Sequence, residues 1–256
     1  MQNLQLGLIQ DALVWEDPEA NRAQLEKTLA EIGSPDVVVL PEMFTTGFST
    51  ASTAKAESMD GASVAWMRDC AKKFGFAITG SVKIAEGERC VNRMIWVQPD
   101  GHLQYYDKRH LFRMAGEHER YSAGNERVIV DFKGWRILLQ VCYDLRFPVF
   151  SRNRDDYDLA LYVANWPAAR REPWCKLLPA RAIENLAFVA GVNRIGTDGN
   201  GIDYAGDSQA FDFKGESLAN LDRSQAFVNI ELDGQALLKF RKKFPAHLDA
   251  DAFELK

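Results

Sequence analysis

Apolar residues recur along the chain in short blocks, and the period within each block predicts the element that it forms. Residues 36–40, Asp-Val-Val-Val-Leu, are a nearly continuous β-branched run, which is typical of a strand buried on both faces of a sheet. Residues 4–10 at first alternate apolar and polar side chains, as a half-buried strand does. The same criteria predict strands at 4–10, 36–40, 76–84, 90–98, 103–106, 128–132, 135–141, 159–164, 187–193, 207–213, 216–219 and 225–231.

Helical periodicity occurs in fewer places. The stretches in which apolar side chains fall on one helical face are 18–32, 64–74, 174–186 and 237–243. Asp17 or Pro18 begins the first of these helices, and Gly75 ends the second. Residues 109–126 are predicted to be a long polar loop or mixed segment, and long ordered loops in compact domains are often functional.

Strands and helices alternate, paired strands follow, and the same order returns after residue 128. This order predicts an α/β architecture in which helices flank two sheets in layers. The two halves are expected to be related in topology, although no repeat is visible at the level of residues. Since no linker or low-complexity tract interrupts the chain, we expect a single domain spanning residues 1–256.

Composition narrows the class of protein. Hydrophobic residues make up 46% of the 256 positions and charged residues 26%, which is ordinary for a soluble globular protein. The net charge of −5 gives no basic field for nucleic acid or an anionic membrane. No apolar stretch approaches the length of a membrane span, and the first residues do not resemble a signal peptide.

The spacing of cysteines and histidines argues against a disulfide scaffold and against a metal site. Four cysteines without a C-x-x-C pair do not form a disulfide scaffold, so we expect a cytoplasmic protein. The four histidines show no metal-ligand spacing, and no Gly-rich nucleotide-binding motif occurs, so we expect neither a metal nor a cofactor. The cysteines at positions 70, 90 and 175 are interpreted as packing residues.

Three chemically distinct side chains directly follow blocks that are predicted to be strands. Cys142 follows the block 135–141 and precedes a polar turn that contains a proline. Glu42 follows the block that ends at Pro41, and Lys108 follows the strand predicted at 103–106 by one further residue. Because ligands of open α/β sheets bind at the carboxyl ends of the strands, these side chains are expected to meet in one site.

Such a set suits attack on a carbonyl carbon. The thiolate is the attacking form of cysteine, so Cys142 needs a base. A buried carboxylate such as Glu42 can take that proton and return it to the leaving group. Lys108 and the backbone N–H of Tyr143 can hold the oxyanion of the tetrahedral intermediate. The charge of Lys108 is also expected to favour the ionised form of Cys142.

Three segments resemble, in sequence, order and spacing, the signatures of the nitrilase (carbon–nitrogen hydrolase) superfamily. They are Pro41-Glu42-Met43-Phe44, Tyr106-Asp107-Lys108-Arg109-His110-Leu111-Phe112 and Val141-Cys142-Tyr143-Asp144-Leu145-Arg146-Phe147. The resemblance runs through the whole chain, including Asn165-Trp166-Pro167 and residues 181–185. Within the superfamily, the chain looks most like the bacterial omega-amidases, which hydrolyse 2-oxoglutaramate.

This resemblance implies a four-layer α-β-β-α sandwich, a Glu-Lys-Cys triad, a covalent acyl-enzyme and no cofactor. It implies that Glu42 is the general base and acid, Lys108 the oxyanion stabiliser and Cys142 the nucleophile. The implied reaction converts the terminal amide of a small dicarboxylic mono-amide, such as 2-oxoglutaramate, to the acid and ammonia through a cysteine thioester. Members of the family commonly pair their sheets across a dimer interface, so a homodimer or higher homo-oligomer is expected.

The resemblance also implies supporting residues. Many members carry a second glutamate after the lysine segment, and Glu117 matches it by its distance to Gly124, with Glu119 as the rival. Glu117 would orient Lys108 and the substrate amide. His110 is expected to fix the loop that carries Lys108. Asp144 and Arg146, in the cysteine segment, are expected to pair with each other or across the turn and to have no catalytic role.

The substrate pocket can be anticipated only in part. The distal carboxylate of a dicarboxylic mono-amide needs a cation, and arginine suits this role through bidentate hydrogen bonds. Arg170 and Arg171, in the loop predicted after a strand, are the candidates for this contact. Phe44, Phe48 and Trp166 stand near predicted strand ends and are candidates for the pocket wall.

Other functions stay open at this stage. An enzyme of the same superfamily can instead hydrolyse nitriles, carbamoyl amines or acylated peptides such as deaminated glutathione, because specificity lies in the shape of the pocket. A catalytically silent scaffold subunit would have no chemical need for the set Glu42, Lys108 and Cys142. A Cys–His hydrolase that uses Cys142 and His110 also fits the residue types.

Overall fold

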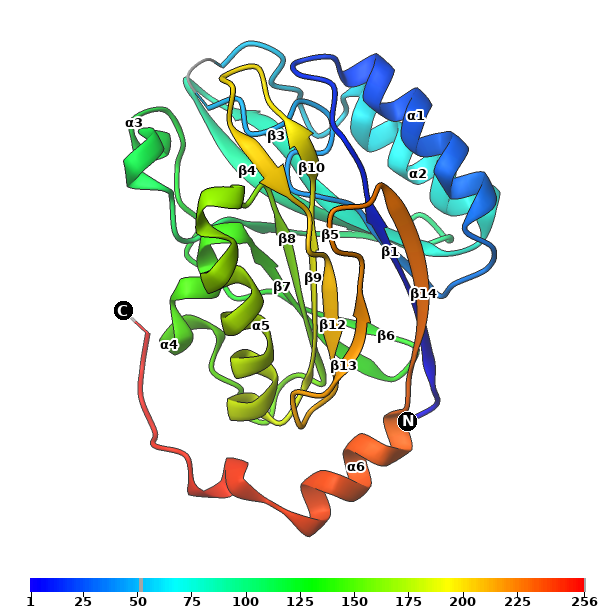
Figure 1. Ribbon diagram of the computed structural model, residues 1–256, viewed down its shortest axis with the longest axis vertical. Coiled ribbons are helices and arrows are strands. Elements are labelled where there is room, and N and C mark those ends of the chain that lie inside the picture. Colours follow the sequence, from blue (N-terminus) through cyan, green and yellow to red (C-terminus); the bar gives the residue numbers. More distant parts are fainter. Residues whose placement is uncertain (51–52, 256) are drawn as a thin grey trace.

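The computed structural model describes residues 1–50 and 53–255, and two six-stranded sheets form its centre (Figure 1). The strands of the first sheet are β1 (Leu4–Gln10), β2 (Val37–Val39), β3 (Ala77–Glu86), β4 (Arg89–Val97), β5 (Leu103–Asp107) and β14 (Ala226–Leu232). Those of the second sheet are β6 (Ile129–Phe132), β7 (Trp135–Val141), β8 (Leu159–Ala164), β9 (Phe188–Asn193), β12 (Gln209–Phe211) and β13 (Ser217–Asn220). A separate hairpin consists of β10 (Ile195–Thr197) and β11 (Asp203–Ala205).

The two sheets have the same topology. The first has the order β14-β1-β2-β3-β4-β5, and the second, read from the corresponding edge, has the order β6-β7-β8-β9-β12-β13. In each, three neighbouring strands are parallel, β1-β2-β3 and β7-β8-β9, and the flanking strands are antiparallel. The relation between the two halves therefore lies in strand order and direction.

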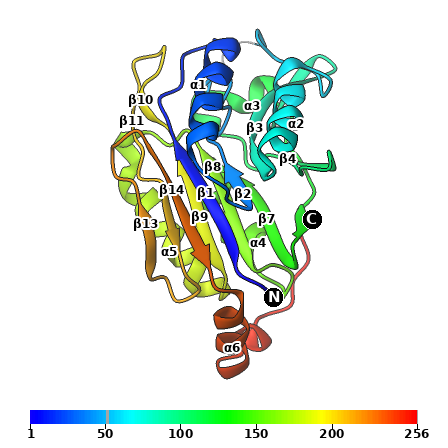
Figure 2. The same ribbon diagram turned by 90° about the vertical axis from the view of Figure 1, so that its right-hand side faces the viewer.

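Helices cover the outer faces of both sheets. The longer helices are α1 (Pro18–Glu31), α2 (Ala62–Phe74), α5 (Arg171–Asn185) and α6 (Gly234–Lys243). The short ones are η1 (Arg113–Ala115), α3 (Glu117–Arg120), η2 (Cys142–Arg146), α4 (Pro148–Ser151), η3 (Ala168–Arg170) and η4 (Ala246–Asp249). Helices α1 and α2 lie side by side over the first sheet, and α5 lies over the second (Figures 1 and 2).

Two apolar layers hold this sandwich together. Leu25 of α1 and Met67 of α2 pack against Val38 and other residues on the outer face of the first sheet. The inner faces of the two sheets meet in the larger core, in which Trp96 of β4 and Leu139 of β7 are both fully buried. Burial of such side chains is worth about 1.5–3 kcal/mol each, so the sheet–sheet contact is a main source of stability.

Local sequence explains where the first two helices begin and end. The carboxylate of Asp17 accepts a hydrogen bond from the backbone N–H of Ala20 at 3.0 Å and so caps α1, and Pro18 occupies the first helical turn. Gly75 follows α2 with φ at 76°, a left-handed conformation that glycine adopts without a steric penalty.

The predicted α-β-β-α layers are confirmed, and the strands of both sheets lie close to their predicted positions. Three local features differ from what the sequence predicts. The hairpin of β10 and β11 was not predicted, because each strand has only three residues on either side of a Gly-rich turn. Helix α5 begins at Arg171 and not at Trp174, and α6 begins at Gly234 and not at Leu237. The segment 109–126 contains η1 and α3, as expected of a mixed segment. Within the described residues, no helix is long and apolar enough to cross a membrane.

Candidate active site

Cys142 lies in a sharp turn at the carboxyl end of β7. It is the first residue of η2, and its φ of 47° falls in the left-handed region, which typically costs a residue with a side chain about 1–3 kcal/mol. The carboxylate of Asp144 holds this turn, since its Oδ2 accepts hydrogen bonds from the backbone N–H of Val141 at 2.9 Å and from the Tyr106 hydroxyl at 2.8 Å. The strained turn thus places Cys142 at the sheet edge.

Glu42 follows β2 and is fully buried. Its Oε1 accepts hydrogen bonds from Nδ2 of Asn92 at 2.7 Å and from Nζ of Lys108 at 3.0 Å. Its Oε2 accepts one from the backbone N–H of Asn165 at 2.7 Å. The carboxylate is therefore held from both sheets, by β4 and β5 of the first and by the end of β8 in the second.

Lys108 follows β5 and bridges two carboxylates. Its Nζ lies 3.0 Å from Oε1 of Glu42 and 3.1 and 3.0 Å from the two carboxylate oxygens of Glu117. Burial lowers the pKa of Lys108, but the charges of Glu117 and Glu42 outweigh burial and hold that pKa above its ordinary value. The ammonium is therefore charged across the physiological pH range.

Glu117 is the buried first residue of α3, and its Oε2 also accepts the backbone N–H of Phe112 at 2.6 Å. Burial raises the pKa of Glu117, while the charge of Lys108 lowers it in part. The rival Glu119 is exposed and lies near Arg120 at the surface. The structure thus brings Glu117 and not Glu119 to Lys108.

The thiol of Cys142 is protonated in the resting enzyme, because opposing effects on its pKa do not cancel. Burial, the charge of Glu42 and a hydrogen bond to Glu42 raise the pKa of the Cys142 thiol well above its ordinary value, and the opposing effect of Lys108 is smaller. The charge of Lys108 does favour the thiolate, as expected, but burial and the charge of Glu42 outweigh it, so the free enzyme holds the neutral thiol. A neutral thiol must pass its proton to a base before or during attack.

This arrangement can perform acyl transfer. Sγ of Cys142 and the carboxylate of Glu42 both lie at the main chain of Asn165, and the ammonium of Lys108 bonds to the same carboxylate. The backbone N–H of Tyr143 directly follows Cys142 in η2. A carboxylate can move the proton, and an ammonium with a backbone N–H can stabilise an oxyanion. Within the described residues, no group of three His, Cys, Asp or Glu side chains could hold a metal ion.

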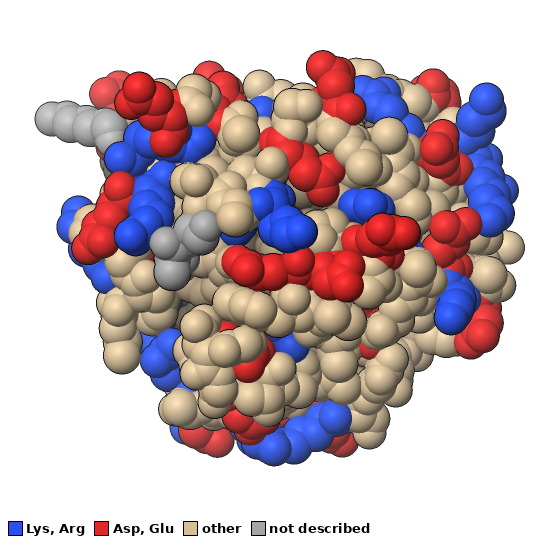
Figure 3. All heavy atoms as spheres, turned by 90° about the horizontal axis from the view of Figure 1, so that it is seen from above, with Lys and Arg blue, Asp and Glu red and all other residues tan. Residues whose placement is uncertain are grey.

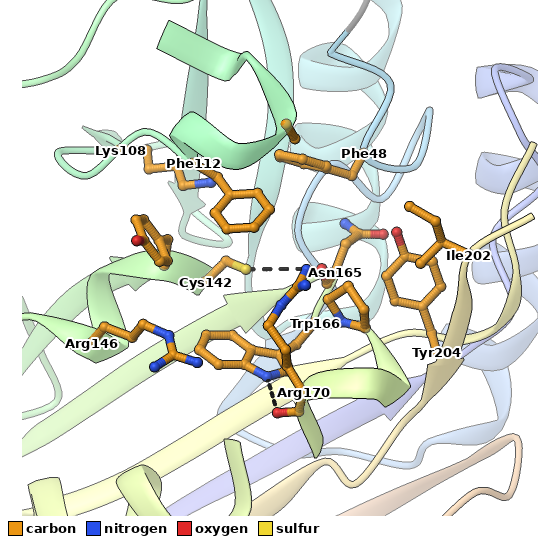
Figure 4. Close-up of a pocket in the computed structure, with 13 residues that line it drawn as sticks. Phe48, Lys108, Phe112, Cys142, Arg146, Asn165, Trp166, Arg170, Ile202 and Tyr204 are labelled. Atoms are coloured by element: carbon orange, nitrogen blue, oxygen red, sulfur yellow. Dashed lines mark hydrogen bonds between the residues drawn. The ribbon is translucent and has the colours of Figure 1, made fainter. Parts of the chain in front are cut away.

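A pocket of about 490 Å³ opens above Cys142 (Figure 4). Its walls are mostly aromatic and apolar, and two guanidinium groups enter it. The lining residues are Phe48, Lys108, Phe112, Ala115, Cys142, Tyr143, Arg146, Asn165, Trp166, Pro167, Arg170, Ile202 and Tyr204. Figure 3 views the molecule from the end where β1 and β2 terminate, and basic and acidic side chains are interspersed on that face.

The candidate substrate residues separate into two groups. Trp166 and Arg170 line the pocket, and Trp166 fixes the loop between them because its Nε1 donates to the backbone carbonyl of Arg170 at 2.6 Å. Arg171 is exposed outside the lining, with its guanidinium bonded to the carboxylate of Asp207 at 2.6 and 2.7 Å. Phe44 is fully buried and packs on Trp66 instead of forming the wall. Arg171 and Phe44 were expected at the pocket because sequence does not give the direction of a side chain near a strand end.

Seven lining residues were not predicted from the sequence, among them Arg146, Phe112, Ile202 and Tyr204. Arg146 lies in the cysteine segment, but only the structure places its guanidinium over the ring of Trp166, 5.3 Å from the centroid. Phe112 comes from the lysine segment. Ile202 and Tyr204 come from the unpredicted hairpin, and no local signal in the sequence indicated them.

His110 and Asp144 form a separate contact behind the nucleophile. Nδ1 of His110 lies 2.7 Å from Oδ1 of Asp144, and the imidazole stacks on Phe147 with ring centroids 3.9 Å apart. Asp144 pairs with His110. The expected pairing of Asp144 with Arg146 is not formed, because the guanidinium of Arg146 lies over Trp166 instead. The geometry favours a structural role for His110, because its ring is engaged by Asp144 and Phe147 and lies outside the pocket lining.

Known proteins resemble this chain in fold and in sequence. Residues 5–237 match the family described as Carbon-nitrogen hydrolase. The chain is 52% identical to Omega-amidase YafV of Escherichia coli K12 over 256 residues, which cover 100% of both chains. It is 35% identical to 2-oxoglutaramate amidase of Bacillus subtilis over 219 residues, which cover 84% of each. The crystal structure of XC1258 from Xanthomonas campestris, a CN-hydrolase superfamily protein with an arsenic adduct in the active site, is similar with a TM-score of 0.98 and 51% identity over 100% of both chains. The chain therefore belongs to the carbon–nitrogen hydrolase family.

Proposed function

We propose that this enzyme is an omega-amidase, which hydrolyses the terminal amide of a small dicarboxylic mono-amide such as 2-oxoglutaramate. The observation that carries this proposal is the pocket itself. Cys142 lies at its floor, and the guanidinium groups of Arg146 and Arg170 line its wall. A substrate with an amide at one end and a carboxylate at the other matches these two chemistries. The high identity to Omega-amidase YafV and the similarity to 2-oxoglutaramate amidase support the same substrate class.

In the proposed first half-reaction, Glu42 takes the proton of the Cys142 thiol and the sulfur attacks the amide carbon. The amide oxygen becomes an oxyanion, which Lys108 and the backbone N–H of Tyr143 stabilise. Collapse of this intermediate breaks the carbon–nitrogen bond. Glu42 gives its proton to the leaving nitrogen, ammonia departs and a thioester on Cys142 remains.

In the second half-reaction, water attacks the thioester carbon while Glu42 accepts a proton from that water. The same oxyanion contacts stabilise the second tetrahedral intermediate. The carbon–sulfur bond then breaks, Glu42 returns the proton to the sulfur, and the dicarboxylic acid leaves. Glu117 keeps Lys108 in place throughout, because it holds both oxygens within 3.1 Å of the ammonium.

The distal carboxylate is proposed to bind Arg170 and Arg146. Neither guanidinium forms an ion pair within the part of the chain that the structure describes, and each lies over an aromatic ring. The guanidinium of Arg170 is 5.0 Å from the centroid of Phe112 and points into the space above Cys142 (Figure 4). Arginine without a carboxylate partner in an apolar pocket attracts an anionic ligand.

The test is ammonia release from 2-oxoglutaramate, 2-oxosuccinamate, glutamine, a nitrile and a carbamoyl amine. We expect the two oxo mono-amides to be turned over with the highest kcat/KM, and Cys142→Ala to release no ammonia from any of them. Cys175→Ala is the matched control, and it should keep wild-type activity because Cys175 lies outside the pocket lining. Preference for the nitrile or the carbamoyl amine, or full turnover by Cys142→Ala, would refute the proposal.

We also propose that the enzyme works in the cytoplasm as a homodimer or higher homo-oligomer. All four cysteines are free, as a reducing compartment would keep them. Val149 of α4 and Ile183 of α5 expose 58% and 53% of their surface, and such apolar side chains suit a contact between copies. Light scattering on the purified protein measures the oligomeric state, and a monomer at micromolar concentration would contradict this part of the proposal.

A further inference from the structure

Asn92 is a fully buried residue of β4 that lies next to the site but outside the pocket lining. Its Nδ2 donates to Oε1 of Glu42 at 2.7 Å. Its backbone carbonyl accepts the backbone N–H of Lys108 at 3.0 Å. One residue of the first sheet therefore contacts the side chain of Glu42 and the main chain of Lys108.

The acceptor atom of the Asn92 amide is unusual. Among the described residues, Oδ1 is buried without a hydrogen-bond partner. Turning the amide over would not help, because Oδ1 would then face Oε1 of Glu42, which only accepts hydrogen bonds when ionised. A buried unpaired carbonyl is unfavourable for folding, so packing alone would favour an apolar side chain here. The donor function of Nδ2 is what an apolar side chain would lose.

The donors around Glu42 divide its two oxygens into different roles. An ionised carboxylate offers about four acceptor positions, two on each oxygen. Asn92 and Lys108 fill both positions on Oε1, and the backbone N–H of Asn165 fills one on Oε2. Counting the hydrogen bonds of the described residues, one position remains, and it is on Oε2. Sγ of Cys142 lies 4.0 Å from the backbone carbonyl of Asn165, the residue whose N–H donates to Oε2, so the sulfur and Oε2 meet at the same main-chain unit.

We propose that Asn92 is a positioning residue that makes Oε2 of Glu42 the atom that accepts the Cys142 proton. This inference rests on the proposed function, since it assigns one atom within the same proton transfer. Without the Nδ2 donor, Oε1 has a free acceptor position and can compete with Oε2 for the thiol proton. Asn92 does not reach the substrate, so its loss changes the chemical step and leaves substrate binding intact.

Asn92→Leu tests this role, because leucine is similar in size to asparagine, cannot donate a hydrogen bond and leaves no room for a replacement water. We expect kcat to fall about 10- to 100-fold, the factor that corresponds to one hydrogen bond to a charged group, with KM changed less than about twofold. The rate of Cys142 alkylation by iodoacetamide at fixed pH should fall in parallel, because it reports proton removal without the amide substrate. The midpoint of thermal unfolding should not fall, since the unpaired Oδ1 is removed together with the donor.

Thr79→Val is the matched control. Thr79 is a fully buried residue of the neighbouring strand β3, and its hydroxyl has no hydrogen-bond partner among the described residues, so it donates nothing to Glu42. This variant should keep kcat and the alkylation rate of the wild type. If Asn92→Leu does not fold, Asn92→Val, whose β-branched side chain suits a strand, takes its place with the same expectations.

Two outcomes separate this inference from the proposed function. A folded Asn92 variant with kcat and alkylation rate within about twofold of the wild type overturns the role of Asn92, while an inactive Cys142→Ala still supports the amidase mechanism. A change confined to KM, or a loss of activity matched by a loss of thermal stability, also overturns it. Full activity of Cys142→Ala overturns the mechanism itself.

Discussion

Tyr106 and Asp144 are joined by a buried hydrogen bond in which the phenol hydroxyl donates to Oδ2 of the carboxylate at 2.8 Å. Tyr106 stands two residues before Lys108, and Asp144 stands two residues after Cys142. The bond therefore links the strand end that carries the ammonium to the turn that carries the nucleophile. Burial and the charge of Asp144 raise the pKa of Tyr106 well above its ordinary value, so the phenol keeps the proton that it donates.

Tyr106→Phe should weaken this link. The change removes the hydroxyl and leaves the ring in the core, so Oδ2 of Asp144 keeps only the Val141 N–H. We expect a loss of about 1–3 kcal/mol in the free energy of unfolding, measured by urea denaturation, and a lower kcat. Tyr105→Phe is the control, because Tyr105 is 45% exposed and should tolerate the loss of its hydroxyl. Equal stability of the two variants would show that the bond is not needed.

Glu117→Gln tests whether Glu117, and not Glu119, is the second glutamate that holds Lys108. Glutamine keeps the shape of the side chain but removes one of the two negative charges that hold the buried Lys108. The pKa of Lys108 should therefore fall, and kcat should drop by about tenfold or more as the oxyanion contact loosens. Glu119→Gln, two residues away at the surface, should keep wild-type kcat in the same ammonia-release assay. Loss of activity in Glu119→Gln alone would reverse our assignment.

Arg170→Ala should raise KM for 2-oxoglutaramate by about tenfold or more, because the distal carboxylate loses a charge-assisted partner. For a neutral short-chain amide, KM should change little in the same variant. Arg171→Ala supplies the control, since that guanidinium is bonded to Asp207 outside the pocket. If Arg170→Ala leaves KM for both amides unchanged, the carboxylate contact lies elsewhere.

The free energy of unfolding should depend on pH through the titration of the Cys142 thiol. Burial and the charge of Glu42 raise the pKa of the Cys142 thiol above its ordinary 9.0, so the folded protein keeps this proton where the unfolded chain releases it. Stability falls with rising pH wherever the folded state binds more protons. Between about pH 8 and pH 10, the wild type should thus lose more free energy of unfolding than Cys142→Ala. Urea denaturation of both proteins across this range measures the difference, and parallel curves would contradict the raised pKa.

The sequence predicted the layers and the central cluster well for a physical reason. Strands buried on both faces are nearly continuous apolar runs, so their ends are easy to locate. Cys142 directly follows β7, and Glu42 stands three residues after β2. Topology then brings the ends of neighbouring strands together. The three motif segments added the proposed roles, because their residue types and order are specific.

The remaining features depend on packing that no local pattern encodes. The hairpin with Ile202 and Tyr204 is held by an antiparallel pairing of only three residues on each strand. The orientation of Arg171 is decided by Asp207, which is distant in sequence, and Asn92 looks like an ordinary strand residue until its amide is seen beside Glu42. Sequence located the backbone of the site, whereas long-range partners decide where its side chains point.

The two sheets divide the reacting atoms between them. Glu42 and Lys108 belong to the first sheet, whereas Cys142 and the N–H of Asn165 belong to the second. Neither half of the chain contains a working set, so catalytic turnover is a direct readout of how well the halves are docked. Two inert fragments, cut in the connection between β5 and β6, should regain turnover on mixing only as fast and as completely as their inner faces reassemble.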